Sequence, residues 1–141
     1  MIRPLILAAL IAAPAAAQER IAIPDGQQVI IRDGDTIRTG GVTYRFPGVD
    51  AAEMDAPCEA GRAAARAARE ALAAFIAASP GRWEIVTTGE ACGRGRPCAD
   101  IEIDGRSAIA AGLESGWLRP WPSCGDGRCD EADRPDWCEG G

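Results

Sequence analysis

The stretch VIIRDGDTIRTGGVTYRF, residues 29–46, contains three short runs rich in β-branched residues. The turn-forming residues 33–35 separate the first run from the second, and Gly40-Gly41 separates the second from the third. Short runs of this kind joined by turn residues are typical of consecutive antiparallel strands. We therefore expect strands at residues 29–31, 36–38 and 42–46.

Downstream of this stretch the pattern changes from strand to helix. Charged residues between Cys58 and Ala78 recur at positions 59, 62, 66 and 69/70 in an alanine-rich segment. One polar stripe on an apolar surface predicts a helix of about five turns. Further strands are expected at 83–87 and 99–103, and Ser107 is placed to cap a second helix that ends near Gly116.

The expected order is three strands, a helix, two strands, a helix and a tail. This order matches the oligonucleotide/oligosaccharide-binding (OB) fold, in which a helix joins the third and fourth strands of a five-stranded barrel. We therefore expect a mainly β protein with helices, built on a five-stranded OB-fold barrel. The expected divisions are a signal peptide at 1–17, the barrel domain at 18–120 and a tail rich in cysteine and acid at 121–141.

Composition narrows the chemistry that the chain can perform. The 141 residues carry a formal net charge of −6, and the sequence contains neither histidine nor lysine. Schiff-base lysines, P-loop lysines, imidazole bases and imidazole metal ligands are therefore excluded. Carboxylate, guanidinium, thiol, hydroxyl and backbone groups remain.

The first residues predict export. Met1-Ile2-Arg3 is a short positive segment, residues 5–13 are apolar, and Ala15-Ala16-Ala17 supplies small residues at a cleavage site. We expect a signal peptide cleaved near Ala17 and a protein of the periplasm or the extracellular space. Without a second long apolar stretch, we expect the mature chain not to insert in a membrane. We also expect it to be a monomer.

The cysteines agree with export. Six cysteines, an even number, in a small exported chain favour disulfides over metal thiolates. Cys92 and Cys98 enclose a loop short enough for a disulfide to clasp it. The remaining four cysteines allow three pairings, which stay open at this point: they are Cys58, Cys124, Cys129 and Cys138.

Acidic and basic residues gather in three segments. Ca²⁺ prefers several oxygen ligands, which Asp35, Asp50 and Glu53 can supply if the barrel brings the turn at 35 beside the end of the third strand. Arginines near them suit a phosphate, because a guanidinium matches phosphate oxygens bidentately. Taken alone, Asp33-Gly34-Asp35-Thr36 is typical of an ordinary hairpin turn, and Arg45 of a surface strand.

Together these segments resemble the thermonuclease family, the staphylococcal-nuclease-like (SNase-like) proteins with an OB-type barrel. The family block D-G-D-T is matched by residues 33–36, and the block R-L-x-G-[IV]-D-[AT]-P-E by residues 45–53. Part of the block D-R-Y-G-R-x-x-A is matched by residues 95–99. The resemblance covers residues 29–117.

The resemblance implies a Ca²⁺-dependent endonuclease, a hydrolase of phosphodiester bonds in DNA, RNA or both. Asp35 and Asp50 correspond to the family's calcium carboxylates, and the Ala51 carbonyl to its backbone ligand. Glu53 corresponds to the carboxylate that positions or deprotonates the attacking water. The phosphate-holding pair corresponds to Arg45 and Arg96.

The sequence departs from the family pattern at several positions. Ala52 replaces a proline before the glutamate, and Arg94 stands at the tyrosine position of the third block. Arg94 therefore competes with Arg96 for the second phosphate-holding role. Trp121 can stack on a base or pack in the interior.

Two other functions stay open. The acidic net charge and the incomplete third block favour an OB-fold binding or interaction module without catalysis. The tail can instead bind calcium or a partner through its acidic residues, which are Asp126, Asp130, Glu131, Asp133 and Asp136.

Overall fold

A computed structural model describes residues 18–139 except 25–26, 79–81 and 126–127. The expected signal peptide at 1–17 lies outside the described residues. The described chain is mainly β with two α-helices. The strands are β1 (Glu19–Ala22), β2 (Val29–Asp33), β3 (Thr36–Thr39), β4 (Val42–Arg45), β5 (Val49–Asp50), β6 (Trp83–Cys92), β7 (Arg96–Ile103), β8 (Arg106–Ser107) and β9 (Arg119–Pro120). The helices are α1 (Glu59–Ala77), α2 (Ala108–Ser115) and the short 3-10 helix η1 (Glu131–Asp133).

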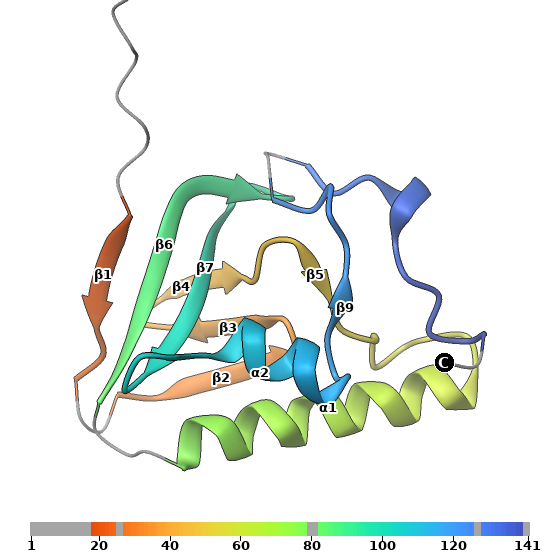
Figure 1. The fold of residues 1–141 in the computed structure, drawn as a ribbon, viewed down its shortest axis with the longest axis horizontal. Coiled ribbons are helices and arrows are strands. Elements are labelled where there is room, and N and C mark those ends of the chain that lie inside the picture. Colours follow the sequence, from red (N-terminus) through yellow and green to blue (C-terminus); the bar gives the residue numbers. More distant parts are fainter. Residues whose placement is uncertain (1–17, 25–26, 79–81, 126–127, 140–141) are drawn as a thin grey trace, which may run out of the picture.

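Most strands belong to one open mixed sheet, in the order β1-β6-β7-β4-β3-β2 with β8 paired to β7 (Figure 1). The meander β2-β3-β4 is antiparallel, as the sequence predicts. Strands β4 and β7 are parallel, with Arg45 opposite Cys98. A separate two-stranded ribbon joins β5 to β9 and places Asp50 opposite Arg119. The sheet and the ribbon together bring the ends of β4 and β5 and the start of β7 close to one another.

The expected strands and helices are all present, with differences at their ends. β6 and β7 continue to a tight hairpin at Gly93–Gly95, beyond the expected limits at residues 87 and 99. β1, β5, β8 and β9 were not expected. Two-residue strands such as β5 and β9 carry no readable periodicity, because pairing between distant segments creates them.

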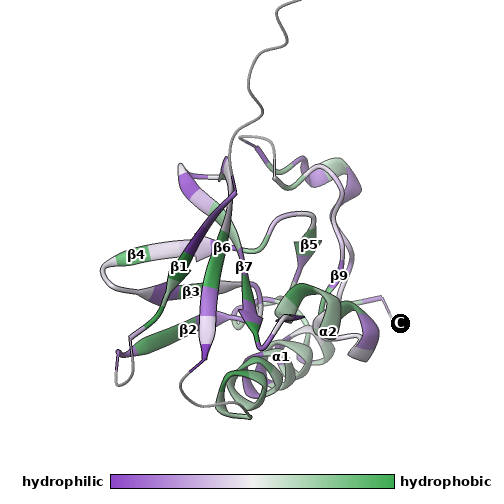
Figure 2. Ribbon diagram, turned by 60° about the vertical axis from the view of Figure 1, so that its left-hand side comes forward, coloured by the Kyte–Doolittle hydropathy of each residue, from purple (hydrophilic) through white to green (hydrophobic). Residues whose placement is uncertain are grey.

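Helix α1 lies beside β2 (Figure 2). Its buried residues are small at the start of the helix and larger and apolar towards its end. A Cβ atom on Gly34 would lie 2.6 Å from the Cβ of Ala68 and 3.0 Å from that of Ala51. The D-G-D-T turn therefore approaches α1 so closely that only glycine fits at position 34. Further along, Leu72 and Phe75 enter the core.

Helix α2 begins and ends at the expected residues. The Ser107 side chain accepts a hydrogen bond from the Ala110 N–H at 3.1 Å, and Gly116 ends the helix in the left-handed conformation, with φ 81°. Both are common helix-terminating arrangements.

Three disulfides connect the chain. The predicted Cys92–Cys98 clasp is confirmed, and the remaining pairs are Cys58–Cys138 and Cys124–Cys129. The tail after β9 leads through η1 and returns to the start of α1, where Cys138 is joined to Cys58 (Figure 1). It is therefore tied to the body at both ends. No helix in the described part of the chain is long and apolar enough to cross a membrane.

Candidate functional site

The D-G-D-T turn directs a carboxylate inward. Asp35 is buried, and its Oδ2 accepts a hydrogen bond from the Ala51 N–H at 2.8 Å. Its Oδ1 accepts one from the Thr36 hydroxyl at 2.8 Å. The backbone of Asp35 is also bonded to the segment after β4, because the Phe46 N–H donates to the Asp35 carbonyl at 2.9 Å. An ordinary exposed hairpin turn needs none of these contacts.

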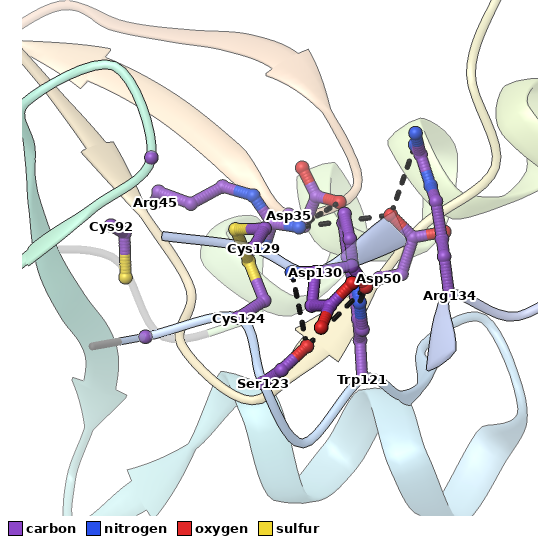
Figure 3. Close-up of a disulfide and its surroundings, with 12 residues drawn as sticks. Asp35, Arg45, Asp50, Cys92, Trp121, Ser123, Cys124, Cys129, Asp130 and Arg134 are labelled. Carbon is purple, nitrogen blue, oxygen red and sulfur yellow. Dashed lines mark hydrogen bonds and ion pairs between the residues drawn. A yellow bond between two sulfur atoms is a disulfide. The ribbon is translucent and has the colours of Figure 1, made fainter. Parts of the chain in front are cut away.

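Arg45, at the end of β4, joins two carboxylates (Figure 3). Its Nη2 lies 3.3 Å from Asp35 Oδ2 and 3.7 Å from Asp50 Oδ1, and the side chains of Arg45 and Asp50 are only 4% and 1% exposed. Asp35 and Asp50 therefore lie on either side of one buried guanidinium, although 14 residues stand between them in the sequence.

Asp50 has further partners from the tail. The Trp137 indole N–H donates to Asp50 Oδ2 at 2.8 Å, and Arg134 Nη2 lies 3.3 Å from Asp50 Oδ1. Burial raises the pKa of the Asp50 carboxyl, while the Trp137 hydrogen bond and the Arg134 charge oppose that rise. A carboxylate this deeply buried needs such partners to remain charged.

Arg134 also holds Glu53. Its Nη2 lies 2.7 Å from Glu53 Oε1, and its Nη1 lies 3.4 Å from Glu131 Oε1. Burial acts against the charged form of Arg134, but the hydrogen bond to Glu53 and the charge of Asp50 outweigh it and raise its pKa. Glu53 itself is 53% exposed and lies at the rim of the site.

The clasped hairpin supplies two more arginines. Arg94 is exposed in the turn with φ 55°, whereas Arg96 begins β7, is partly buried and donates from Nε to the Gly93 carbonyl at 3.2 Å. Burial and the positive charge of Arg45 lower the pKa of Arg96. The expected turn geometry, with Arg94 at the tip and Arg96 entering the strand, is confirmed. Both side chains nevertheless line the same pocket.

That pocket has a volume of ≈ 280 Å³ and a mostly charged lining. Asp50 lies behind it, paired with Arg45 and Arg134. The lining residues are Asp33, Asp35, Thr36, Arg45, Glu53, Gly93, Arg94, Arg96, Trp121, Cys129, Glu131 and Arg134. Burial and the negative charges of Asp35 and Glu53 raise the pKa of Asp33.

Trp121 lines the pocket and contacts the tail. It is buried, and its indole N–H donates to the Asp130 carbonyl at 2.7 Å and to Asp133 Oδ1 at 3.0 Å. The guanidinium carbons of Arg45 and Arg134 lie 6.0 Å and 4.8 Å from its ring centre. Of the two roles considered for Trp121, these contacts match interior packing.

The chemistry of this residue set fits Ca²⁺. Asp35, Asp50 and Glu53 supply hard oxygen donors, which Ca²⁺ prefers. In this conformation, however, guanidinium groups pair with them, and among the described residues no three acidic or cysteine side chains are grouped to hold a metal ion. Binding of Ca²⁺ therefore requires a guanidinium to give up a carboxylate. Ala51 is buried and joins Asp35 through its N–H, and its carbonyl remains a predicted ligand.

The motifs predict that the carboxylates and the hairpin arginines share one site. They do not predict the contribution of the tail. Arg134 and Trp137 carry no motif, and their place depends on which cysteine Cys138 joins. The only signal was an arginine and a tryptophan within a stapled acidic segment.

No known protein-family model matches the chain, and no curated protein matches its sequence.

Proposed function

We propose that this protein is an exported Ca²⁺-dependent nuclease that hydrolyses phosphodiester bonds of DNA, RNA or both. One observation carries the proposal: the three segments that resemble thermonuclease blocks, at residues 33–36, 45–53 and 95–99, meet around one charged pocket. In the same proposal, the meander, the β6–β7 hairpin and α1 form an OB-type barrel scaffold of the SNase-like kind.

The arginines suit a phosphate diester. Phosphoryl transfer requires the charge on the equatorial oxygens to be neutralised and the attacking water to be aligned. Arg96 and Arg94 face the pocket from the hairpin, and Arg45 faces it from β4. Because Arg45 is held by Asp35 and Asp50, its guanidinium is fixed before substrate arrives.

Glu53 is the candidate base. Its carboxylate lies at the pocket rim and is half exposed, where it can accept a proton from an attacking water. Asp35, Asp50 and the Ala51 carbonyl are the proposed calcium ligands together with Glu53. When bound, Ca²⁺ supplies positive charge next to the scissile phosphate and lowers the pKa of water.

The second candidate is a binding or interaction module without catalysis. The observation that favours it is the ion pair between Arg134 Nη2 and Glu53 Oε1, 2.7 Å apart. In this ion pair the carboxylate of the proposed base is bound to another side chain. The net charge of −6 also opposes general attraction to nucleic acid. A module of this kind would bind its ligand without consuming it.

A nuclease assay on a Glu53→Gln variant separates the two. We expect the oxidised wild-type protein to cleave single-stranded DNA or RNA with Ca²⁺ and the variant to be slower by about 10²–10⁴-fold, the scale of a lost general base. Glu114→Gln, on the exposed face of α2, is the matched control. Equal rates for wild type and Glu53→Gln, or binding without cleavage by the wild type, would contradict the proposal.

The compartment is part of the proposal. Disulfides persist in oxidising environments, and all six cysteines of the chain are paired. This supports export to the periplasm or beyond, which the expected signal peptide predicts. The substrate would then be extracellular or periplasmic nucleic acid.

A further inference from the structure

A positively charged side chain from the tail lies between two proposed calcium ligands. Arg134 Nη2 is 3.3 Å from Asp50 Oδ1 and 2.7 Å from Glu53 Oε1, so a single nitrogen bridges both carboxylates. The two contacts connect residues more than 80 positions apart in the sequence. In this conformation Arg134 supplies the positive charge that a cation would bring.

The tail is held over the site at several points (Figure 3). The Arg134 guanidinium lies 4.8 Å from the Trp121 ring centre, and Trp137 donates to Asp50 at 2.8 Å. Cys138 is covalently joined to Cys58, which caps α1 shortly after the segment that carries Glu53. These contacts leave Arg134 few alternative positions.

We propose that the tail is an internal cap in which Arg134 competes with Ca²⁺ for Asp50 and Glu53. This inference rests on the proposed function, because it assigns regulation to the same site. In the capped state the carboxylates are neutralised by the chain itself. In the open state Arg134 leaves, and the same oxygens become available to the metal.

The competition follows from geometry and charge. Ca²⁺ needs its oxygen ligands at about 2.3–2.6 Å, so it must take the same oxygens of Asp50 and Glu53 that Arg134 holds. Two positive charges at one pair of carboxylates repel each other strongly in a partly buried site. Only molecules with an open cap therefore bind Ca²⁺. The apparent dissociation constant equals that of the open state divided by the fraction of molecules that are open.

The Cys58–Cys138 disulfide raises the effective concentration of Arg134 at the site. Without it, the last part of the tail can move away, so the effective concentration of Arg134 at the carboxylates is lower. Arg134 would still be attached through the Cys124–Cys129 loop and Trp121. Loss of the Cys58–Cys138 bond should therefore reduce the competition by Arg134 only partly, whereas replacing Arg134 by a neutral residue removes its competing charge altogether.

Calorimetric titration with Ca²⁺ tests the cap without depending on catalysis. The proteins are oxidised wild type, Arg134→Gln, Cys58→Ser/Cys138→Ser and Arg94→Gln. Arg94 lines the same pocket but has no ion pair with Asp50 or Glu53 among the described residues, so its variant controls for the loss of one positive charge. Circular dichroism establishes that each variant is folded.

We expect Arg134→Gln to bind Ca²⁺ at least about tenfold more tightly than wild type, which corresponds to about 1.4 kcal/mol. The double cysteine variant should lie between them, and Arg94→Gln should differ from wild type much less than Arg134→Gln does. If Arg134→Gln binds no more tightly than Arg94→Gln, or if no variant binds Ca²⁺, the cap is refuted. It is also refuted if wild type cleaves nucleic acid in chelator and Arg134→Gln does not, because Arg134 would then act in the reaction itself.

Nuclease rates measured in parallel separate this inference from the function on which it rests. Tighter Ca²⁺ binding by Arg134→Gln with no cleavage by any variant would support the competition and contradict the nuclease. Calcium-dependent cleavage by wild type with unchanged affinity in Arg134→Gln would support the nuclease and contradict the cap.

Discussion

Loss of the Cys58–Cys138 disulfide should destabilise the protein more than loss of either short-loop disulfide. The bond joins residues 80 positions apart, whereas Cys124–Cys129 closes a separation of 5. A cross-link stabilises the folded state chiefly by restricting the unfolded chain, and the restriction grows with the closed loop. The Cys58→Ser/Cys138→Ser variant tests this directly, because serine can still cap α1 at position 58.

The magnitude follows from the loop lengths. Chain-entropy arithmetic gives about 4.5 kcal/mol at 25 °C for the separation of 80 and about 2 kcal/mol for the separation of 5. The free energy of unfolding should therefore fall by about 2.5 kcal/mol more in the long-loop variant than in Cys124→Ala/Cys129→Ala. The lost contacts of the tail with Asp50 and Glu53 act in the same direction.

Equilibrium urea unfolding, followed by circular dichroism, measures both losses. We expect the long-loop variant to have a clearly lower unfolding midpoint than the short-loop variant at a comparable m-value. Equal losses, or a larger loss in the short-loop variant, would refute the reasoning from loop closure.

Three further predictions concern the turn and the pocket. Gly34→Ala should cost about 1–3 kcal/mol of unfolding free energy, because the added methyl would lie 2.6 Å from Ala68, and urea unfolding measures the loss. Asp33→Asn should gain stability relative to wild type as the pH rises from 3 to 7: burial raises the pKa of Asp33, so the folded state holds its proton more tightly, and stability is lost as pH rises through that raised pKa. Unfolding at several pH values checks the sign, and an unchanged difference between the two proteins would contradict it. Arg96→Ala should slow turnover by about 10²–10³-fold, whereas Arg94→Ala should change mainly substrate affinity and its salt dependence; equal effects in steady-state kinetics would exclude the assignment of Arg96.

Local pattern was enough to predict the elements that carry their own periodicity. The runs between residues 29 and 46 alternate with turn residues, and the structure forms a meander there. The polar stripe after Cys58 predicted α1 to within one residue at each end. The β5–β9 ribbon could not be predicted in this way, because each strand is two residues long and exists only through the other.

The site residues that belong to sequence motifs could be predicted. The tail residue Arg134 could not, because its place depends on a contact between distant parts of the chain. Asp35 and Arg45 lie in a turn and at a strand end that the expected meander brings together, and Asp50 follows shortly after the last strand of that meander. Arg134 comes from the tail, whose return to the start of α1 depends on the pairing of Cys138 with Cys58, one of several pairings that the sequence permits. An arginine in an acidic segment otherwise indicates a solvated ion pair rather than a cap.

The initial rate of phosphodiester hydrolysis by the oxidised protein, with Ca²⁺ and with an excess of chelator, tests the central claim most directly. Single-stranded DNA and RNA of equal length should both be offered, since the proposed contacts of the pocket arginines are to phosphate, which carries no sequence information. We expect cleavage of at least one substrate with Ca²⁺ and its loss in chelator. Binding of nucleic acid without cleavage under either condition would contradict the account and identify the protein as a binding module.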